Sequence, residues 1–168
     1  MTGAAAGAAP PLRRRLAAFV YEGVLLFGVL MVSGWLYSSL TQQRHALQGR
    51  SGLQAFLFVV LAIYFVWFWT HGGQTVAMKT WRVRVVAADG APLSQWRALL
   101  RYLLSWLWFL PGLGAIQLAG LHTGWPITAV VLAGVLAYAA ASRLHPQRQF
   151  LHDVLAGTRV VDATPAGG

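Results

Sequence analysis

The sequence predicts an all-α membrane protein: a four-helix transmembrane bundle with short amphipathic and β segments on its cytoplasmic side. Three observations lead to this fold class. Of the 168 residues, 57% are hydrophobic and only 10% are charged, whereas a soluble domain carries about 25% charged residues. Apolar stretches of about 18 residues or more, the length of a membrane-spanning helix, recur along the chain. The 13 basic residues, set against 4 acidic ones, fall between these stretches.

The same composition excludes several classes of protein. Nucleic-acid-binding proteins gather basic residues on one exposed face, which this spacing does not provide. The absence of cysteine excludes disulfides and cysteine-based metal sites or nucleophiles. Because G-x-S-x-G, H-E-x-x-H and P-loop patterns are all missing, we expect no enzyme activity and no cofactor. His145, His152 and Asp153 could be combined into a metal site, but histidines near an interface are more often plain polar contacts, so we expect no metal.

Four apolar segments are the candidate spans. They cover residues 16–40, 53–70, 102–121 and 125–142. The first follows a basic N-terminus, as in a secretory signal, but it exceeds the about 7–15 residues of a signal core and no small-residue cleavage site follows. Residues 13–162 therefore form one membrane domain. It lies between a disordered N-terminal tail, 1–12, and a C-terminal tail, 163–168.

The positions of arginine and lysine predict the orientation. Eleven of the thirteen basic residues lie in three groups, at 13–15, 71–101 and 143–162, and the other two lie in the loop 41–52. With four spans the three groups share one side of the membrane, which places both termini in the cytoplasm. Three spans would separate the C-terminal arginines from the rest.

The last two spans carry small residues and helix breakers. A short link, 122–124, makes them antiparallel neighbours. Pro111, Gly112 and Gly114 could break the third span at membrane depth. Along the fourth span a small residue recurs every four positions, which predicts either a close helix contact or simply a frequent use of alanine. These residues are Ala129, Ala133, Ala137 and Ala141.

Two stretches outside the spans resemble each other. Residues 74–86 read QTVAMKTWRVRVV and residues 149–161 read QFLHDVLAGTRVV. In the first, Val83 and Val85 alternate with arginines, as in a half-buried strand. The likeness is short, and chance is the alternative. A true repeat predicts two cytoplasmic strands, each after a short amphipathic helix, that pair because a lone strand leaves backbone groups unpaired.

Glu22 is the most costly residue to place in a membrane. It lies seven residues after Arg15, about 10 Å along a helix, at a depth where an ionisable group should have a partner. We expect a basic partner from another segment and expect Asp153 to be the reciprocal acid, paired with Arg13–Arg15 or with Arg97. The candidate partners of Glu22 are Arg97, Arg101, Arg148 and Arg159.

The candidate charge cluster and ion site therefore consists of Arg15, Glu22, Arg97, Arg101 and Asp153. Two interpretations stay open. In the first, the cluster is a set of fixed ion pairs that docks the cytoplasmic segments onto the bundle; in the second, Glu22 is a proton or cation site. Asp153 has a further alternative, as a cap of the turn Val154–Ala156 before Gly157.

Four segments together resemble the RDD family of bacterial integral membrane proteins. They are RLAAFVYEG (15–23), GQTVAMKTWRVRVVAADG (73–90), PLSQWRALLR (92–101) and FLHDVLAGTRVV (150–161). The family arginine maps to Arg15, its first aspartate to Glu22 and its last to Asp153. Glu22 is a departure from the family pattern, as are Ala77 and Met78 in place of its Gly-Lys. The resemblance implies a multi-pass protein of the bacterial inner membrane, for which transport is often suggested.

Two functional hypotheses follow. In the first, the protein is a small transporter or ion-translocating protein that uses Glu22 and the interrupted third span, and a homo-oligomer completes the pathway because four helices form a narrow bundle. In the second, it is a non-transporting scaffold or accessory protein. Its basic cytoplasmic face would then bind a membrane partner or anionic lipid. Beyond these and the lipid bilayer itself, we expect no nucleic-acid partner.

Overall fold

The computed structural model describes residues 8–41, 50–121 and 124–164. They form a mostly helical molecule with one two-stranded sheet. The elements are α1 (Leu12–Leu40), α2 (Arg50–Thr70), α3 (Val76–Thr80), β1 (Val83–Ala87), α4 (Gln95–Ser105), the 3₁₀ helix η1 (Trp106–Trp108), α5 (Leu110–Leu118), α6 (Trp125–Ala141), α7 (Leu151–Leu155) and β2 (Thr158–Asp162). The tail residues 1–7 and 165–168 lie outside the described part, so the predictions made for them stay predictions.

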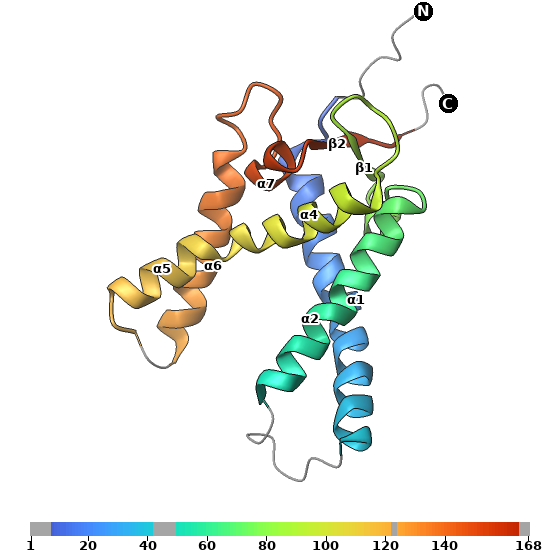
Figure 1. Cartoon of the computed structure of the whole chain (residues 1–168). Helices are drawn as coiled ribbons and strands as arrows, with labels where there is room; N and C mark the ends of the chain where they lie inside the picture. The colour runs from blue at the N-terminus through green and yellow to red at the C-terminus, as the bar shows by residue number, and fades with distance from the viewer. Residues whose placement is uncertain (1–7, 42–49, 122–123, 165–168) are drawn as a thin grey trace, which may run out of the picture.

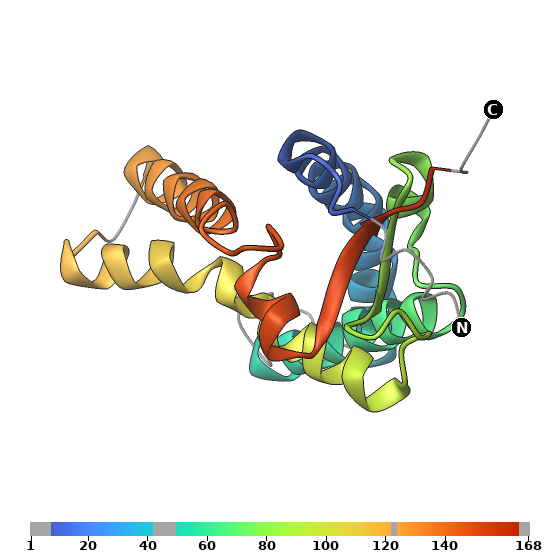
Figure 2. The same ribbon diagram turned by 90° about the horizontal axis from the view of Figure 1, so that it is seen from above.

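The long helices form two groups joined by α4. Helices α1 and α2 lie side by side in one group, and α5 and α6 form the other. Both views, Figure 1 and Figure 2, show these two pairs. The sheet and the short helices α3 and α7 gather at one end of the molecule, next to the N-terminal end of α1 and the C-terminal end of α2 (Figure 1). This end is called the sheet end below.

Three helical stretches are long and apolar enough to cross a membrane. They are Leu12–Leu40, Arg50–Thr70 and Gln95–Leu118, the last running through η1. The predicted fourth span corresponds to α6, which is apolar but only 17 residues long. Ten large hydrophobic side chains of α1 and four of α2 are exposed, as expected of helices whose surroundings are lipid rather than water.

The predicted third span is not one regular helix. The α-helical pattern ends at Ser105, three residues of 3₁₀ helix follow, and α5 starts at Leu110. Pro111 does not break a helix at its own position, because it lies in the first turn of α5, where its missing N–H costs nothing. The interruption is therefore a few residues earlier than the sequence suggests, at the aromatic stretch Trp106–Trp108.

Two glycines let α5 and α6 pack closely. A Cβ added to Gly134 would lie 2.5 Å from the backbone nitrogen of Gly112, and one added to Gly112 would lie 2.9 Å from the Cα of Val131. The sequence predicted the antiparallel pair but not the contact that forms it. The alanine repeat of α6 does not make this contact, because Ala129, Ala133, Ala137 and Ala141 are all exposed in the single chain.

Gly134→Ala is expected to destabilise the protein by about 1–3 kcal/mol, because its methyl group has no room against Gly112. Gly114→Ala, on α5, is the matched control, since a Cβ there meets no atom within 4 Å. We expect that variant to be neutral or slightly stabilising, as alanine favours a helix. Thermal unfolding of both purified variants measures the difference; equal melting temperatures would contradict the close crossing.

The predicted pairing of the two repeated stretches is confirmed. β1 and β2 are antiparallel neighbours, with Val83 opposite Asp162 and Ala87 opposite Thr158. Each strand follows a short helix, α3 or α7, as the repeat implied. Alternate residues of β1 are buried, and Arg84 between them is exposed, so the valine–arginine alternation was interpreted correctly.

The glutamines that open the two stretches have related roles. Gln74 Nε2 donates a hydrogen bond to the carbonyl of Val83 at 2.8 Å. Gln149 Nε2 donates to the carbonyl of Val160 at 3.0 Å, and Val160 N–H donates back to Gln149 Oε1 at 2.8 Å. Each side chain therefore ties the entry of its short helix to the strand that follows. Gly73, with φ of 73°, brings its carbonyl within 2.8 Å of the Val85 nitrogen.

The N-terminal segment is ordered closer to the start than expected. Residues 8–11 were assigned to a disordered tail, yet the carbonyl of Ala8 accepts a hydrogen bond from the Asp162 N–H at 3.0 Å. Pro10 is fully buried. The N-terminal segment thus packs against β2 before α1 begins.

Candidate functional site

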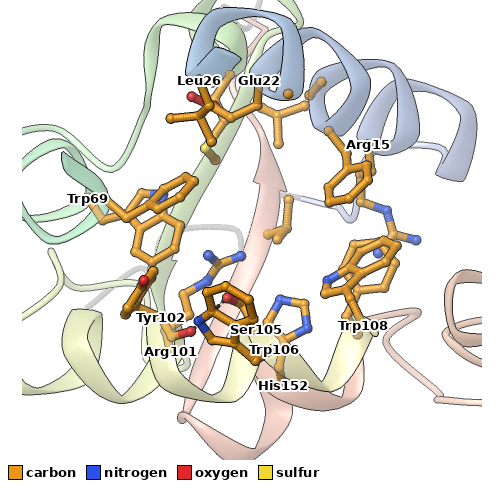
Figure 3. A pocket seen from close by; sticks show the side chains of 18 of the residues that line it. Arg15, Glu22, Leu26, Trp69, Arg101, Tyr102, Ser105, Trp106, Trp108 and His152 are labelled. Carbon is orange, nitrogen blue, oxygen red and sulfur yellow. Dashed lines mark hydrogen bonds between the residues drawn. The ribbon is translucent and has the colours of Figure 1, made fainter. Parts of the chain in front are cut away.

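A cavity of about 420 Å³ lies between α1, α2, α4 and the sheet. Its walls are mainly apolar and aromatic. Four acidic or basic side chains also line it; three of them are predicted site residues, and the fourth is next to Asp153 in the sequence. These are Arg15, Glu22, Arg101 and His152. Figure 3 shows them around one space, with Trp69, Tyr102 and Trp106 on one side and Trp108 on the other. Its size falls in the range of small-molecule sites, about 300–1,000 Å³.

Glu22 lines the cavity but has no arginine partner. Its Oε1 accepts a hydrogen bond from the Tyr64 hydroxyl at 2.7 Å, and its Oε2 accepts a short one from the Thr75 hydroxyl. The side chain is buried, and within the described residues no ion pair reaches it. The predicted pairing with Arg97, Arg101, Arg148 or Arg159 is therefore wrong. Two neutral hydroxyls take the place of a cation.

Asp153 pairs with an arginine, as predicted, but the partner is Arg101 rather than Arg97 or one of Arg13–Arg15. Arg101 Nε donates to Asp153 Oδ1 at 2.8 Å, and both side chains are buried. The Thr158 hydroxyl lies 3.2 Å from the Asp153 carbonyl oxygen. Asp153 sits inside α7, whose N-cap residue is Phe150, so the alternative that Asp153 caps the turn is wrong. The Arg101 guanidinium also stacks 4.1 Å above the ring of Trp69.

Arg15 is buried near this pair without a direct partner. Its guanidinium lies 4.3 Å from the centre of the Phe150 ring. Its Nε and Nη1 are buried and have no hydrogen-bond partner in the described part of the chain. The neighbouring Arg14 instead pairs with Asp162, at the edge of the sheet. The predicted contact of Asp153 with Arg13–Arg15 is therefore absent as a direct ion pair.

His152 is held neutral beside the Arg101–Asp153 pair. Its Nδ1 lies 3.0 Å from the Tyr138 hydroxyl, and its Nε2 lies 3.5 Å from Asp153 Oδ1. A neutral ring with its proton on Nε2 fits both contacts. Burial lowers the pKa of His152 to about 4; the Asp153 carboxylate opposes this shift, and the cationic Arg101 and Arg15 add to it.

The remaining predicted residues are elsewhere. Arg97 is exposed one turn before Arg101, outside the cavity, so it does not belong to the charge cluster. Arg148 is also exposed. Within residues 8–41, 50–121 and 124–164, no three His, Asp or Glu side chains form a group that could hold a metal ion. The structure thus joins Arg101 to Asp153, places Arg15 and Glu22 on the same cavity, and separates Arg97 from them.

Sequence reasoning missed the hydroxyl groups of the site. Tyr64 is a single hydroxyl in an otherwise apolar stretch of α2, and Thr75 is the N-cap of α3. Tyr138 on α6 accepts a hydrogen bond from the His152 backbone N–H at 3.0 Å. A signal was available for the first two, because an acid within a span requires donors, and tyrosine and threonine provide them.

Comparison with known proteins gives one match. The model of the RDD family matches residues 9–157, which is most of the chain and contains every residue that lines the cavity except Val160. No curated protein and no solved structure is significantly similar to the chain.

Proposed function

Because the chain belongs to the RDD family and has three helices long and apolar enough to cross a membrane, we propose that this membrane protein spans the bacterial inner membrane four times and translocates a small cation or a proton. The function requires no catalysis and no cofactor. Glu22 is the proposed carrier of the ion, and a homo-oligomer is proposed to complete the pathway, since four helices form a narrow bundle.

The four-span topology is supported by the positions of the chain ends and the charges. Ala8 and Asp162 are hydrogen-bonded at the sheet end, and two chain ends on one side of the membrane favour an even number of crossings. Helix α6, at 17 residues, is about 26 Å long, and a shortfall of a few Å against the bilayer core has a modest cost. The positive-inside rule then favours a cytoplasmic sheet end, because exposed basic residues gather on the segments there. They are Arg13, Lys79, Arg82, Arg84, Arg97, Arg143 and Arg148.

The single observation that supports translocation is the setting of Glu22. A buried carboxyl group on a cavity wall, held by the hydroxyls of Tyr64 and Thr75 and without a cation, matches the usual features of an intramembrane ion or proton site. The Arg101–Asp153 pair, by contrast, is satisfied within the fold. We therefore assign ion binding to Glu22 and fold assembly to the pair.

Flux measurements in proteoliposomes test this function. We expect wild-type protein to collapse an imposed proton or Na⁺ gradient. With Glu22→Gln the gradient should decay no faster than in protein-free vesicles, because the amide neither carries a negative charge nor takes up a proton. Asp89→Asn is the matched control, since Asp89 is an exposed acid of a surface turn, and it should retain full flux. Equal flux in wild type and Glu22→Gln would remove Glu22 from the mechanism.

The exposed basic surface favours one other function. In this second candidate the sheet end of an accessory protein would bind a membrane partner or anionic headgroups. The flux assay separates the two functions. A folded wild type without flux, together with a stoichiometric partner in purification from native membranes, would favour the accessory role.

A further inference from the structure

The cavity is lined by a buried arginine, Arg15, that has no ion-pair partner within the described residues. Arg15 is 6% exposed, and its buried Nε and Nη1 have no hydrogen-bond partner in the described part of the chain. Leaving a buried charged donor unpaired has a large cost. Glu22 forms no ion pair with it within the described residues, and its two oxygens accept hydrogen bonds from the hydroxyls of Tyr64 and Thr75. A group with negative charge is therefore missing from the contacts of Arg15.

Arg101 adds a second cation to the cavity, on the side of Trp69, whereas Arg15 lies on the side of Trp108 (Figure 3). Its Nε is bound to Asp153, but within the described residues no hydrogen bond involves its two terminal nitrogens. Figure 3 shows its guanidinium projecting into the cavity between Trp69 and His152. His152 also lines the cavity, and because burial lowers its pKa to about 4, it is neutral at physiological pH. The part of the cavity nearest the sheet end thus holds two guanidinium groups, of which only that of Arg101 is paired with a carboxylate within the described residues, that of Asp153.

The rest of the cavity is lined mainly by apolar and aromatic side chains, together with Glu22 and Ser105, and extends away from the sheet end. Leu26 lies eleven residues beyond Arg15 on α1, about 16 Å along the axis. Leu61 and Phe65 line the cavity from α2. Since α2 reaches the sheet end at Thr70, these two residues lie farther from the sheet end. The cavity therefore has a cationic end at the membrane interface and an apolar wall that runs toward the bilayer core. The first suits an anionic lipid headgroup, and the second suits an acyl chain.

We propose that this cavity binds an acidic phospholipid, with the headgroup phosphate against Arg15 and Arg101 and one acyl chain along Leu26, Leu61 and Phe65. Guanidinium groups bind phosphate through charge-assisted hydrogen bonds, and a phosphate at this end of the cavity would supply the negative charge that the contacts of Arg15 lack. The site is distinct from the exposed basic surface, because both arginines are buried. It does not depend on ion movement through Glu22, so either proposal can fail alone.

Lipid binding to the full-length protein tests the site. In native mass spectrometry from a nonionic detergent, we expect one phosphatidylglycerol to bind at least about tenfold more tightly than phosphatidylcholine with the same acyl chains. Arg15→Gln should remove that preference. Arg97→Gln, which changes the net charge equally at an exposed position, should keep it. Equal binding of the two lipids, or an unchanged preference in Arg15→Gln, would show that Arg15 is compensated within the protein and would overturn the proposal.

A second pair of variants tests the chain-binding wall without altering charge. A Cβ at Gly23, which lines the cavity, meets no atom within 4 Å, and the same holds at Gly28, which does not line it. Both changes favour the helix, so both proteins should fold. We expect Gly23→Leu to weaken phosphatidylglycerol binding about tenfold and Gly28→Leu to leave it unchanged. Equal affinity in both, or full competition by inorganic phosphate alone, would overturn the lipid assignment.

Discussion

Arg101→Met is expected to lower the free energy of unfolding by about 3–5 kcal/mol, the range for removing one partner of a buried ion pair. The methionine side chain can fill the space of the arginine stem, so the loss comes from Asp153. Its carboxylate is fully buried, and Oδ2 already has no partner in the described residues. Without Arg101 both oxygens would lack a cation.

A double-mutant cycle measures the pair itself. Combining Arg101→Met with Asp153→Asn removes both charges, and we expect this variant to be more stable than Arg101→Met alone, since uncharged replacements of a buried pair are often tolerated. The control is Arg14→Gln, which breaks the more exposed Arg14–Asp162 pair and should cost at most about 1 kcal/mol. Guanidinium titrations in detergent give the stabilities of wild type, Arg101→Met, Asp153→Asn, the double variant and Arg14→Gln. A loss below about 1 kcal/mol for Arg101→Met would contradict a structural role of the pair.

The protein is expected to lose about 2 kcal/mol of stability between pH 7.5 and pH 5 through His152 alone. Burial holds the pKa of His152 at about 4 in the folded chain, whereas an exposed histidine titrates near about 6.5. Between these values the unfolded state binds more protons. The stabilising contribution is therefore complete above about pH 6.5 and is lost as the pH falls toward about 4.

Unfolding of His152→Gln isolates this effect. We expect the variant to show a smaller loss of stability between pH 7.5 and pH 5 than wild type does, because it has no imidazole to protonate. His71→Gln is the control, since His71 is exposed at the end of α2, and its pH profile should follow that of wild type. Parallel profiles for wild type and His152→Gln would mean that the histidine is not kept neutral.

The sheet end was the part of the fold that could be predicted best from sequence. Two stretches with the same first and last residues predicted two strands that pair, and the observed register joins Val85 to Val160. The prediction succeeded because strand alternation is a local pattern and an unpaired strand is costly. The close contact of Gly112 with Gly134 was not predicted, since it depends on how two helices rotate against each other.

The charge cluster was predicted in composition but not in pairing. Arg97 and Arg101 share a helix face by spacing, yet only Arg101 is buried against α7, and Arg97 is exposed. For Glu22, charge balance suggested an arginine, whereas the structure provides Tyr64 and Thr75. Sequence shows which groups require partners; the rotation and depth of each helix decide which partner is within reach.

The distance between Arg101 and Asp153 along the chain has a consequence for biosynthesis. The two residues are 52 positions apart, so at about 5–20 residues per second the ribosome delivers the acid roughly 3–10 s after the arginine. During that interval α4 must enter or approach the membrane with an uncompensated charge. The strand β1 is without its partner β2 for a longer interval, because the paired residues lie farther apart along the chain. Assembly of the sheet end is thus a late event, because it requires α7 and β2, the last elements described. A nascent chain stalled before α7 would leave Arg101 without its carboxylate and β1 without its partner strand.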